Sequence, residues 1–111
     1  MPPSGFGPQR RSKKLKVDSR NFSFINEEKI AYSYLKKGRL LEAEKIYNKL
    51  EKNGYVNENI YLNKAAIYFF NDQLQLAIKN LFNVLKLNPD SSEALLKLGV
   101  IFIKTFNYNK S

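Results

Sequence analysis

The side chains able to do chemistry in this chain are amines, guanidiniums and carboxylates, because Cys and His are both absent. Without them the chain has no thiol nucleophile, imidazole base, disulfide or usual zinc ligand set. The ten acidic residues are scattered, and pairs such as Glu27 and Glu28 lie among lysines at spacings that favour surface ion pairs on helices. We therefore expect neither an enzyme nor a site for a cofactor or a metal.

The densest charge lies near the N-terminus, where residues 10–20 hold six cations and one acid, Asp18: Arg10, Arg11, Lys13, Lys14, Lys16 and Arg20. Three of the four prolines and two of the five glycines come just before it. Such a composition buries too little apolar surface to offset the entropy of ordering, so we predict a disordered basic arm over residues 1–24. The arm could bind nucleic acid or an anionic surface through phosphates, or it could be a solvated tail, since no aromatic residue is interleaved for base stacking.

The elements that must position any site follow from residue 25 onward. Apolar residues recur there at spacings of three and four, which predicts helices. Turn residues interrupt the pattern at residues 37–38, 53–54, 71–72 and 88–90, leaving five segments of about 11–14 residues. Asn26 and Asn57 can cap helices, and residues 90–93 have the form of a capping box. Short helices joined by short turns pack as antiparallel neighbours, so we predict an all-α domain over residues 25–111.

The helical segments repeat with a period of 34 residues. Small residues recur as Ala31, Ala65 and Gly99. Further matches along the period are Tyr34, Tyr68 and Phe102, then Ala43 and Ala77, then Tyr47 and Leu81. The small residues suit places where two helices approach closely, and the aromatic residues suit the space between neighbouring helices, so we expect all of them in the core.

Small and aromatic residues at these offsets resemble the tetratricopeptide repeat (TPR), with repeats at about 24–57, 58–91 and, in part, 92–111. The resemblance implies antiparallel helix pairs stacked as a short superhelix of about two and a half repeats. Lys64 stands where the TPR pattern has Leu, and we expect its methylenes to cover apolar surface while the amine reaches water. The glycine-rich, Lys-rich start also resembles that of longer bacterial proteins with TPRs ahead of a sulfotransferase or methyltransferase type of domain.

The TPR resemblance further implies a concave groove lined by the first helix of each repeat, which in that family commonly binds a peptide or helix of a partner. Two acids, Glu28 and Glu93, occupy positions where a clamp for a terminal carboxylate needs cations, so we expect an apolar groove for a protein segment. The groove could instead be covered by Phe22 and Phe24 of the arm or by a second copy of the chain. The predicted groove residues are Tyr32, Leu35, Leu62, Ala66, Phe69, Phe70, Leu96, Val100 and Ile103.

The last helical segment is apolar nearly all round, from Ala94 to Ile103. A helix of that kind is usually buried on more than one side, so we expect either a longer repeat array or packing on another subunit. No apolar run reaches the roughly 20 residues that span a bilayer, and no hydrophobic stretch follows the basic start. We therefore expect a cytoplasmic protein that binds another protein or a second copy of itself.

Overall fold

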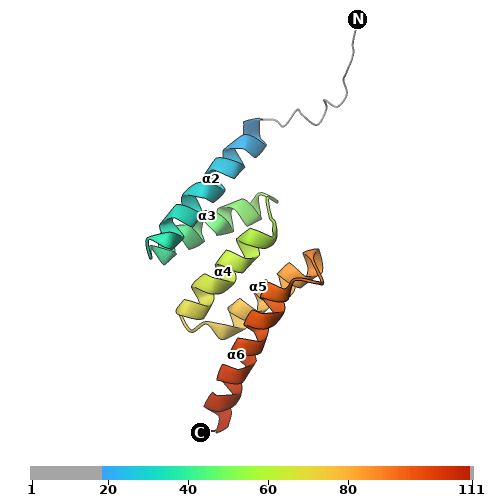
Figure 1. Ribbon diagram of the computed structural model, residues 1–111. Helices are drawn as coiled ribbons and strands as arrows, with labels where there is room; N and C mark the ends of the chain where they lie inside the picture. Colours follow the sequence, from blue (N-terminus) through green and yellow to red (C-terminus); the bar gives the residue numbers. More distant parts are fainter. Residues whose placement is uncertain (1–18, 111) are drawn as a thin grey trace, which may run out of the picture.

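The computed structural model describes the backbone of residues 19–110 and the side chains of residues 21–106. This part of the chain forms five α-helices and no strand, which confirms the all-α prediction (Figure 1). In chain order they are α2 (Ser19–Lys36), α3 (Leu40–Lys52), α4 (Glu58–Phe70), α5 (Leu74–Leu87) and α6 (Ser92–Lys110).

The first helix begins earlier than the sequence suggested. Residues 19–24, assigned above to the arm, belong to α2, and Asn26 lies inside that helix instead of capping it. The half-buried ring of Phe24 packs on Tyr55, with ring centroids 5.5 Å apart, and this contact anchors the added turn. The rest of the predicted arm, residues 1–18, lies outside the described residues.

The 34-residue period recurs in the backbone of the turns. Gly38 has φ +81° and Asp72, 34 residues later, has φ +61°. Both stand in the left-handed region, which glycine adopts freely and Asp tolerates better than most residues. The Arg39 amide donates to the Tyr34 carbonyl at 2.9 Å, and the matching bond from Gln73 to Tyr68 measures 2.8 Å. Equivalent positions of the two repeats therefore close the same turn.

Two helices begin with side-chain caps. The side-chain oxygen of Asn57 accepts from the amide of Ile60 at 2.8 Å, as predicted. At the start of α6 the hydroxyl of Ser91 accepts from the amide of Ala94 at 3.2 Å, one residue later than the predicted box implied. The N-termini of α3 and α5 have no side-chain cap, so tertiary packing must stabilise these helices.

The helices pack mainly on their neighbours in the chain: α2 on α3, α4 on α5, and α5 on α6. Two buried clusters result, and α4 contributes residues to both. The N-terminal core consists of Ala31, Ala43, Tyr47, Leu50, Ile60 and Ile67. The C-terminal core consists of Leu62, Ala65, Tyr68, Ala77, Leu81, Val84, Ala94, Leu98 and Ile101.

Polar contacts join α3 to α4 at the boundary of the two cores. The hydroxyl of Tyr68 donates to Glu44 at 2.9 Å, and the amine of Lys64 donates to Glu51. The expectation that the Lys64 amine reaches water is wrong, because the side chain is buried and ends on that carboxylate. A lysine is tolerated at this apolar position because the preceding helix supplies its counter-charge.

The small residues of the repeat do not share one environment. Ala31 and Ala65 are buried, as expected, but Gly99 is exposed, and a Cβ built there would meet nothing within 4 Å. Phe102 is likewise exposed, whereas the equivalent Tyr68 is buried. Placing Gly99 and Phe102 in the core was therefore wrong. The reason is that α3 and α5 cover this side of α2 and α4, and no described helix covers it on α6.

Candidate functional site

Two hollows lie along α4: the first is bordered by α2 and α6, and the second lies between α4 and α6. The polar pocket, of about 570 Å³, is lined by Ile25, Glu28, Lys29, Tyr32, Tyr47, Asn59, Leu62, Asn63 and Glu93. The apolar pocket, of about 350 Å³, is lined by Ala65, Ala66, Phe69, Phe70, Leu81, Leu96, Lys97, Val100 and Ile101. Residues 59–63 of α4 line the first and residues 65–70 line the second, so the two pockets follow each other along α4, and we call them together the groove.

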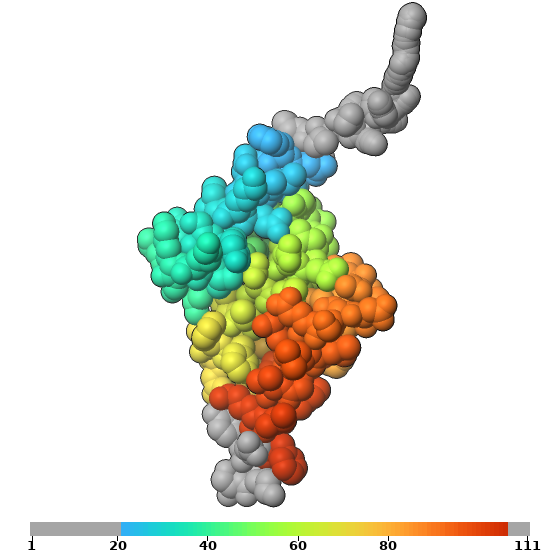
Figure 2. Space-filling model, in the orientation of Figure 1, coloured from blue at the N-terminus to red at the C-terminus, as the bar shows by residue number. Residues whose placement is uncertain are grey.

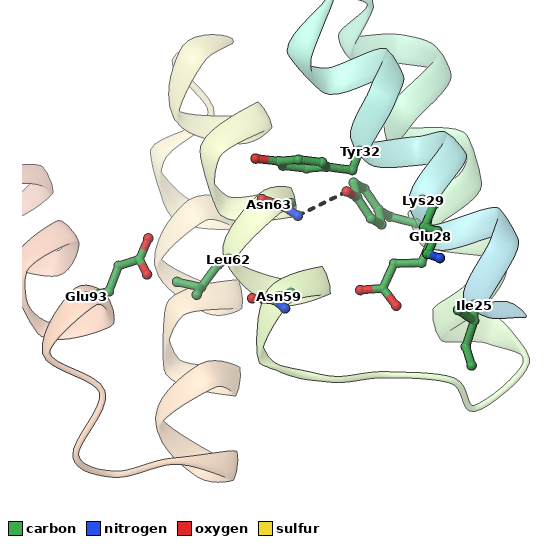
Figure 3. Close-up of a pocket in the computed structure, with 9 residues that line it drawn as sticks. Ile25, Glu28, Lys29, Tyr32, Asn59, Leu62, Asn63 and Glu93 are labelled. Atoms are coloured by element: carbon green, nitrogen blue, oxygen red, sulfur yellow. Dashed lines mark hydrogen bonds between the residues drawn. The ribbon is translucent and has the colours of Figure 1, made fainter.

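The polar pocket holds two carboxylates from opposite walls. Figure 3 shows Glu28 on α2 and Glu93 on α6, with Asn59, Leu62 and Asn63 of α4 between them. Glu28 is held in place, since its carboxylate accepts from the hydroxyl of Tyr55 at 2.9 Å and from the side-chain amide of Asn57 at 3.3 Å.

The hydrogen bond from Tyr55 also affects the tyrosine. Burial, and then the bond to the Glu28 carboxylate, raise the pKa of Tyr55. The phenol therefore remains a donor at neutral pH and keeps the Glu28 carboxylate oriented. Glu93 lies on the surface with Lys97 one turn away, its carboxylate 3.8 Å from the amine. The pocket thus presents one positioned carboxylate and one more adjustable one.

Tyr47 of α3 forms part of the pocket wall. Its hydroxyl accepts from the side-chain amide of Asn63 at 3.0 Å, the bond drawn in Figure 3. Burial raises the pKa of Tyr47 to about 12, although the bond from Asn63 acts in the opposite direction. The phenol stays protonated at neutral pH, so Tyr47 gives the pocket a polar, uncharged surface.

The apolar pocket carries some of the most exposed hydrophobic side chains of the described residues. Phe70 is 73% exposed and Leu96 is 71% exposed, while Val100 is about half exposed. The half-buried Phe69 lies beneath the amine of Lys104, 5.9 Å from the ring centroid. Apolar surface gathered around one hollow is suited to an apolar side chain of a ligand and is a frequent sign of an interaction site.

The predicted groove residues divide between the two pockets. Tyr32 and Leu62 line the polar pocket; Ala66, Phe69, Phe70, Leu96 and Val100 line the apolar pocket. Leu35 lines neither, because it packs against the N-terminal core, and Ile103, although it follows Leu96 and Val100 on the same side of α6, is exposed and lines neither pocket.

The predicted basic arm falls almost wholly outside the described structure. Arg10, Arg11, Lys13, Lys14 and Lys16 precede the described residues, and only the backbone of Arg20, in α2, is described. Binding of nucleic acid or of an anionic surface by the arm therefore stays a prediction.

Sequence reasoning treated the groove as mainly apolar and did not identify the polar pocket as a unit. It placed Tyr47 correctly in the core but did not predict that this residue also lines the polar pocket. The available signal was the hydroxyl, since a buried tyrosine needs a hydrogen-bond partner, and here Asn63 provides it.

Comparison of the chain with protein-family models, curated proteins and solved structures found no match. Over residues 19–110 no helix is long and apolar enough to cross a membrane. Among the described side chains no three acidic residues gather in a way that could hold a metal ion.

Proposed function

We propose that this chain is a helical-repeat interaction module of the tetratricopeptide type, which binds a segment of another protein in the groove of α2, α4 and α6. The observation that carries the proposal is the cluster of exposed Phe70, Leu96 and Val100 around one hollow, next to the carboxylates of Glu28 and Glu93. The 34-residue period, present both in the side chains and in the turn hydrogen bonds, supports the TPR assignment.

The two pockets specify complementary chemistry in the partner. The apolar pocket suits a Leu, Ile, Met or Phe side chain. The polar pocket suits the cation of a Lys or Arg at the Glu28 carboxylate, and a ligand cation can also compete with Lys97 for Glu93, although Lys29 in the lining offsets part of the attraction. Asn59 and Phe70 mark the far ends of the groove along α4, about 16 Å apart at 1.5 Å per residue. A helical ligand spans that distance in about eleven residues, and an extended one in about five.

The affinity is measured with fluorescein-labelled peptides of about 16 residues. Each peptide carries one apolar anchor residue and one Lys, separated by about eleven residues for a helical ligand or by about five for an extended one. Loss of the exposed Phe70 ring removes on the order of 1.4 kcal/mol of apolar burial, so Phe70→Ala should weaken binding about tenfold. Phe82→Ala is the matched control, because Phe82 is also an exposed ring but lies on α5, outside both pockets. Equal losses in the two variants would exclude the apolar pocket as the binding site.

The polar pocket is tested separately with Glu28→Gln combined with Glu93→Gln. Glutamine keeps an acceptor for Tyr55 and Asn57 while removing both charges. The wild type should prefer a Lys-containing peptide to its Lys→Gln analogue several-fold, and the double variant should bind the two alike. A wild type that binds every peptide equally contradicts the groove proposal.

A further inference from the structure

One side of α6 presents an apolar surface that is separate from most of the groove. Leu95, Gly99, Phe102 and Ile103 stand at helix positions i, i+4, i+7 and i+8, which share one side. We call these four residues the α6 face. The three large side chains are 53%, 50% and 64% exposed in chain order, and no charged residue is among them. In Figure 2 α6 forms the C-terminal end of the stack.

The repeat itself shows what such a face contacts. Residues 34 positions earlier, on α4, are Tyr61, Ala65, Tyr68 and Phe69, and those 68 positions earlier, on α2, are Glu27, Ala31, Tyr34 and Leu35. All eight are buried or half-buried, whereas all four on α6 are exposed. This face of the fold is thus covered in two repeats and left uncovered in the third.

In the two covered repeats an antiparallel helix brings a small residue to the contact. Ala43 of α3 lies in the same core as Ala31, and Ala77 of α5 lies in the same core as Ala65. Larger residues follow each alanine four and seven positions later: Tyr47 and Leu50 after Ala43, and Leu81 and Val84 after Ala77. The helix that covers the α6 face should therefore present a small residue flanked by large apolar ones, one turn away.

Gly99 supports a close contact at the centre of this face. Glycine within a helix is less stable than alanine, and here a Cβ would meet nothing within 4 Å. The missing side chain gains its value only when another helix comes close. The α6 helix of a second copy is itself a suitable partner, because it offers a small residue flanked by Leu95 and Ile103, each one turn from Gly99.

We propose that two copies of this chain associate through the α6 face, with the two α6 helices antiparallel and crossing at Gly99. In this arrangement Leu95 packs against Ile103 of the second copy, because both lie four residues, about 6 Å, from the crossing point. The α6 face borders the groove at Leu96, which lines the apolar pocket and is not one of the four residues of the face. A charged partner is disfavoured because the face carries no charge with which to attract one.

The size of the face sets the expected affinity. Three half-exposed large side chains and Leu96 offer on the order of 400 Å² per copy, against about 800 Å² per partner in a typical stable complex. We therefore expect a weak dimer, with a dissociation constant on the order of 10 µM or above.

The geometry is tested with single-cysteine variants of the full chain, which has no cysteine of its own. When two thiols form a disulfide, two Cu(II) phenanthroline ions each take one electron and become Cu(I), and the two protons pass to the buffer. Gly99→Cys should form a covalent dimer, because the two residues meet at the crossing. Leu95→Cys alone should not form a covalent dimer, since its two copies would stand about 12 Å apart, beyond the reach of a disulfide. A mixture of Leu95→Cys and Ile103→Cys chains should form one, because these two residues face each other across the crossing. Leu41→Cys is the control, an exposed residue on α3.

The mass in solution gives a second measurement that needs no cysteine. Sedimentation equilibrium from 10 to about 300 µM should show wild type and Leu41→Lys forming dimers and Leu95→Lys remaining a monomer, with peptide binding in the groove unchanged. The proposal is overturned if the wild type stays a monomer at the highest concentration. It is equally overturned if Leu95→Cys or Leu41→Cys cross-links as readily as Gly99→Cys.

Discussion

Lys64 shows how a single residue can depend on a contact from another helix. It is 6% exposed, and its amine donates to Glu51 of α3. Removing one partner of a buried ion pair leaves a charge without compensation, whereas replacing the lysine by an apolar side chain of similar size removes the desolvation cost as well. The two kinds of substitution should therefore have opposite consequences for stability.

We predict that Glu51→Gln lowers the free energy of unfolding by about 1–3 kcal/mol, less than for a fully buried pair because Glu51 is partly exposed. Lys64→Leu should be neutral or stabilising, and adding Glu51→Gln to Lys64→Leu should cost little. Urea unfolding followed by circular dichroism measures all three variants. If Glu51→Gln cost as much stability in the Lys64→Leu background as in the wild type, Glu51 would stabilise the fold through a contact other than the one with Lys64.

A second residue-scale prediction concerns the tyrosines at the boundary of the two cores. Burial raises the pKa of Tyr47 to about 12 and, together with the bond to Glu44, that of Tyr68 to about 12, from a usual value of 10. The folded state therefore binds these protons more tightly than the unfolded state does. Their contribution to stability is complete below pH 10 and is lost as the pH rises from 10 through 12.

The alkaline loss is measured by urea unfolding at several values from pH 9 to 11.5. Wild type should lose stability more steeply than Tyr47→Phe combined with Tyr68→Phe, which lacks both titrating groups. Lysine titration is common to both proteins and cancels in the comparison. Parallel pH profiles would contradict the prediction.

At the scale of the helices, Ala65 and Gly99 form a matched pair, since they occupy the same position of successive repeats. Ala65 is buried between α4 and α5, so Ala65→Leu should overpack the pair and cost about 1–3 kcal/mol. Gly99 has open space around it in the single chain, so Gly99→Ala should raise stability by about 0.5–1 kcal/mol. Thermal unfolding at 1–2 µM, where we expect monomers, gives both values, and a destabilised Gly99→Ala would contradict the assignment.

The helices could be predicted from sequence because their signals are local. Gly38 and Gly54 mark turns through their positive φ, and Asn57 caps α4 through its own side chain. The start of α2 was misplaced because it depends on Phe24 contacting Tyr55, some thirty residues away. Gly99 was misplaced for a related reason: a repeat period shows which positions are equivalent, but not whether a helix covers them.

The candidate site was predictable only in part. The apolar half of the groove follows from helix offsets, since five of the nine predicted residues line the apolar pocket. The polar half depends on side chains from four helices and a loop that converge only in the folded chain, such as Tyr55 on Glu28 and Asn63 on Tyr47. No local pattern encodes such convergence.

At the scale of the whole molecule, the formal charge of +9 acts differently on the two proposed contacts. Two copies that meet at an uncharged face repel each other through the charge elsewhere, and salt screens this repulsion. Raising NaCl from about 50 to 500 mM should therefore strengthen α6 association several-fold in sedimentation equilibrium. The same change should weaken binding of a Lys-containing peptide to the groove. A dimer that weakens with salt would indicate charged contacts outside the α6 face.

The sharing of α4 between the two cores has a consequence for the order in which the chain can fold. The N-terminal core includes Ile60 and Ile67, so the α2–α3 hairpin cannot complete its own core during synthesis until α4 has left the ribosome. Other residues of α4, namely Leu62, Ala65 and Tyr68, belong to the C-terminal core, so the same helix is needed to complete both cores. Contacts between helices adjacent in the chain keep loop closure short, which is typical of domains that fold in milliseconds or less.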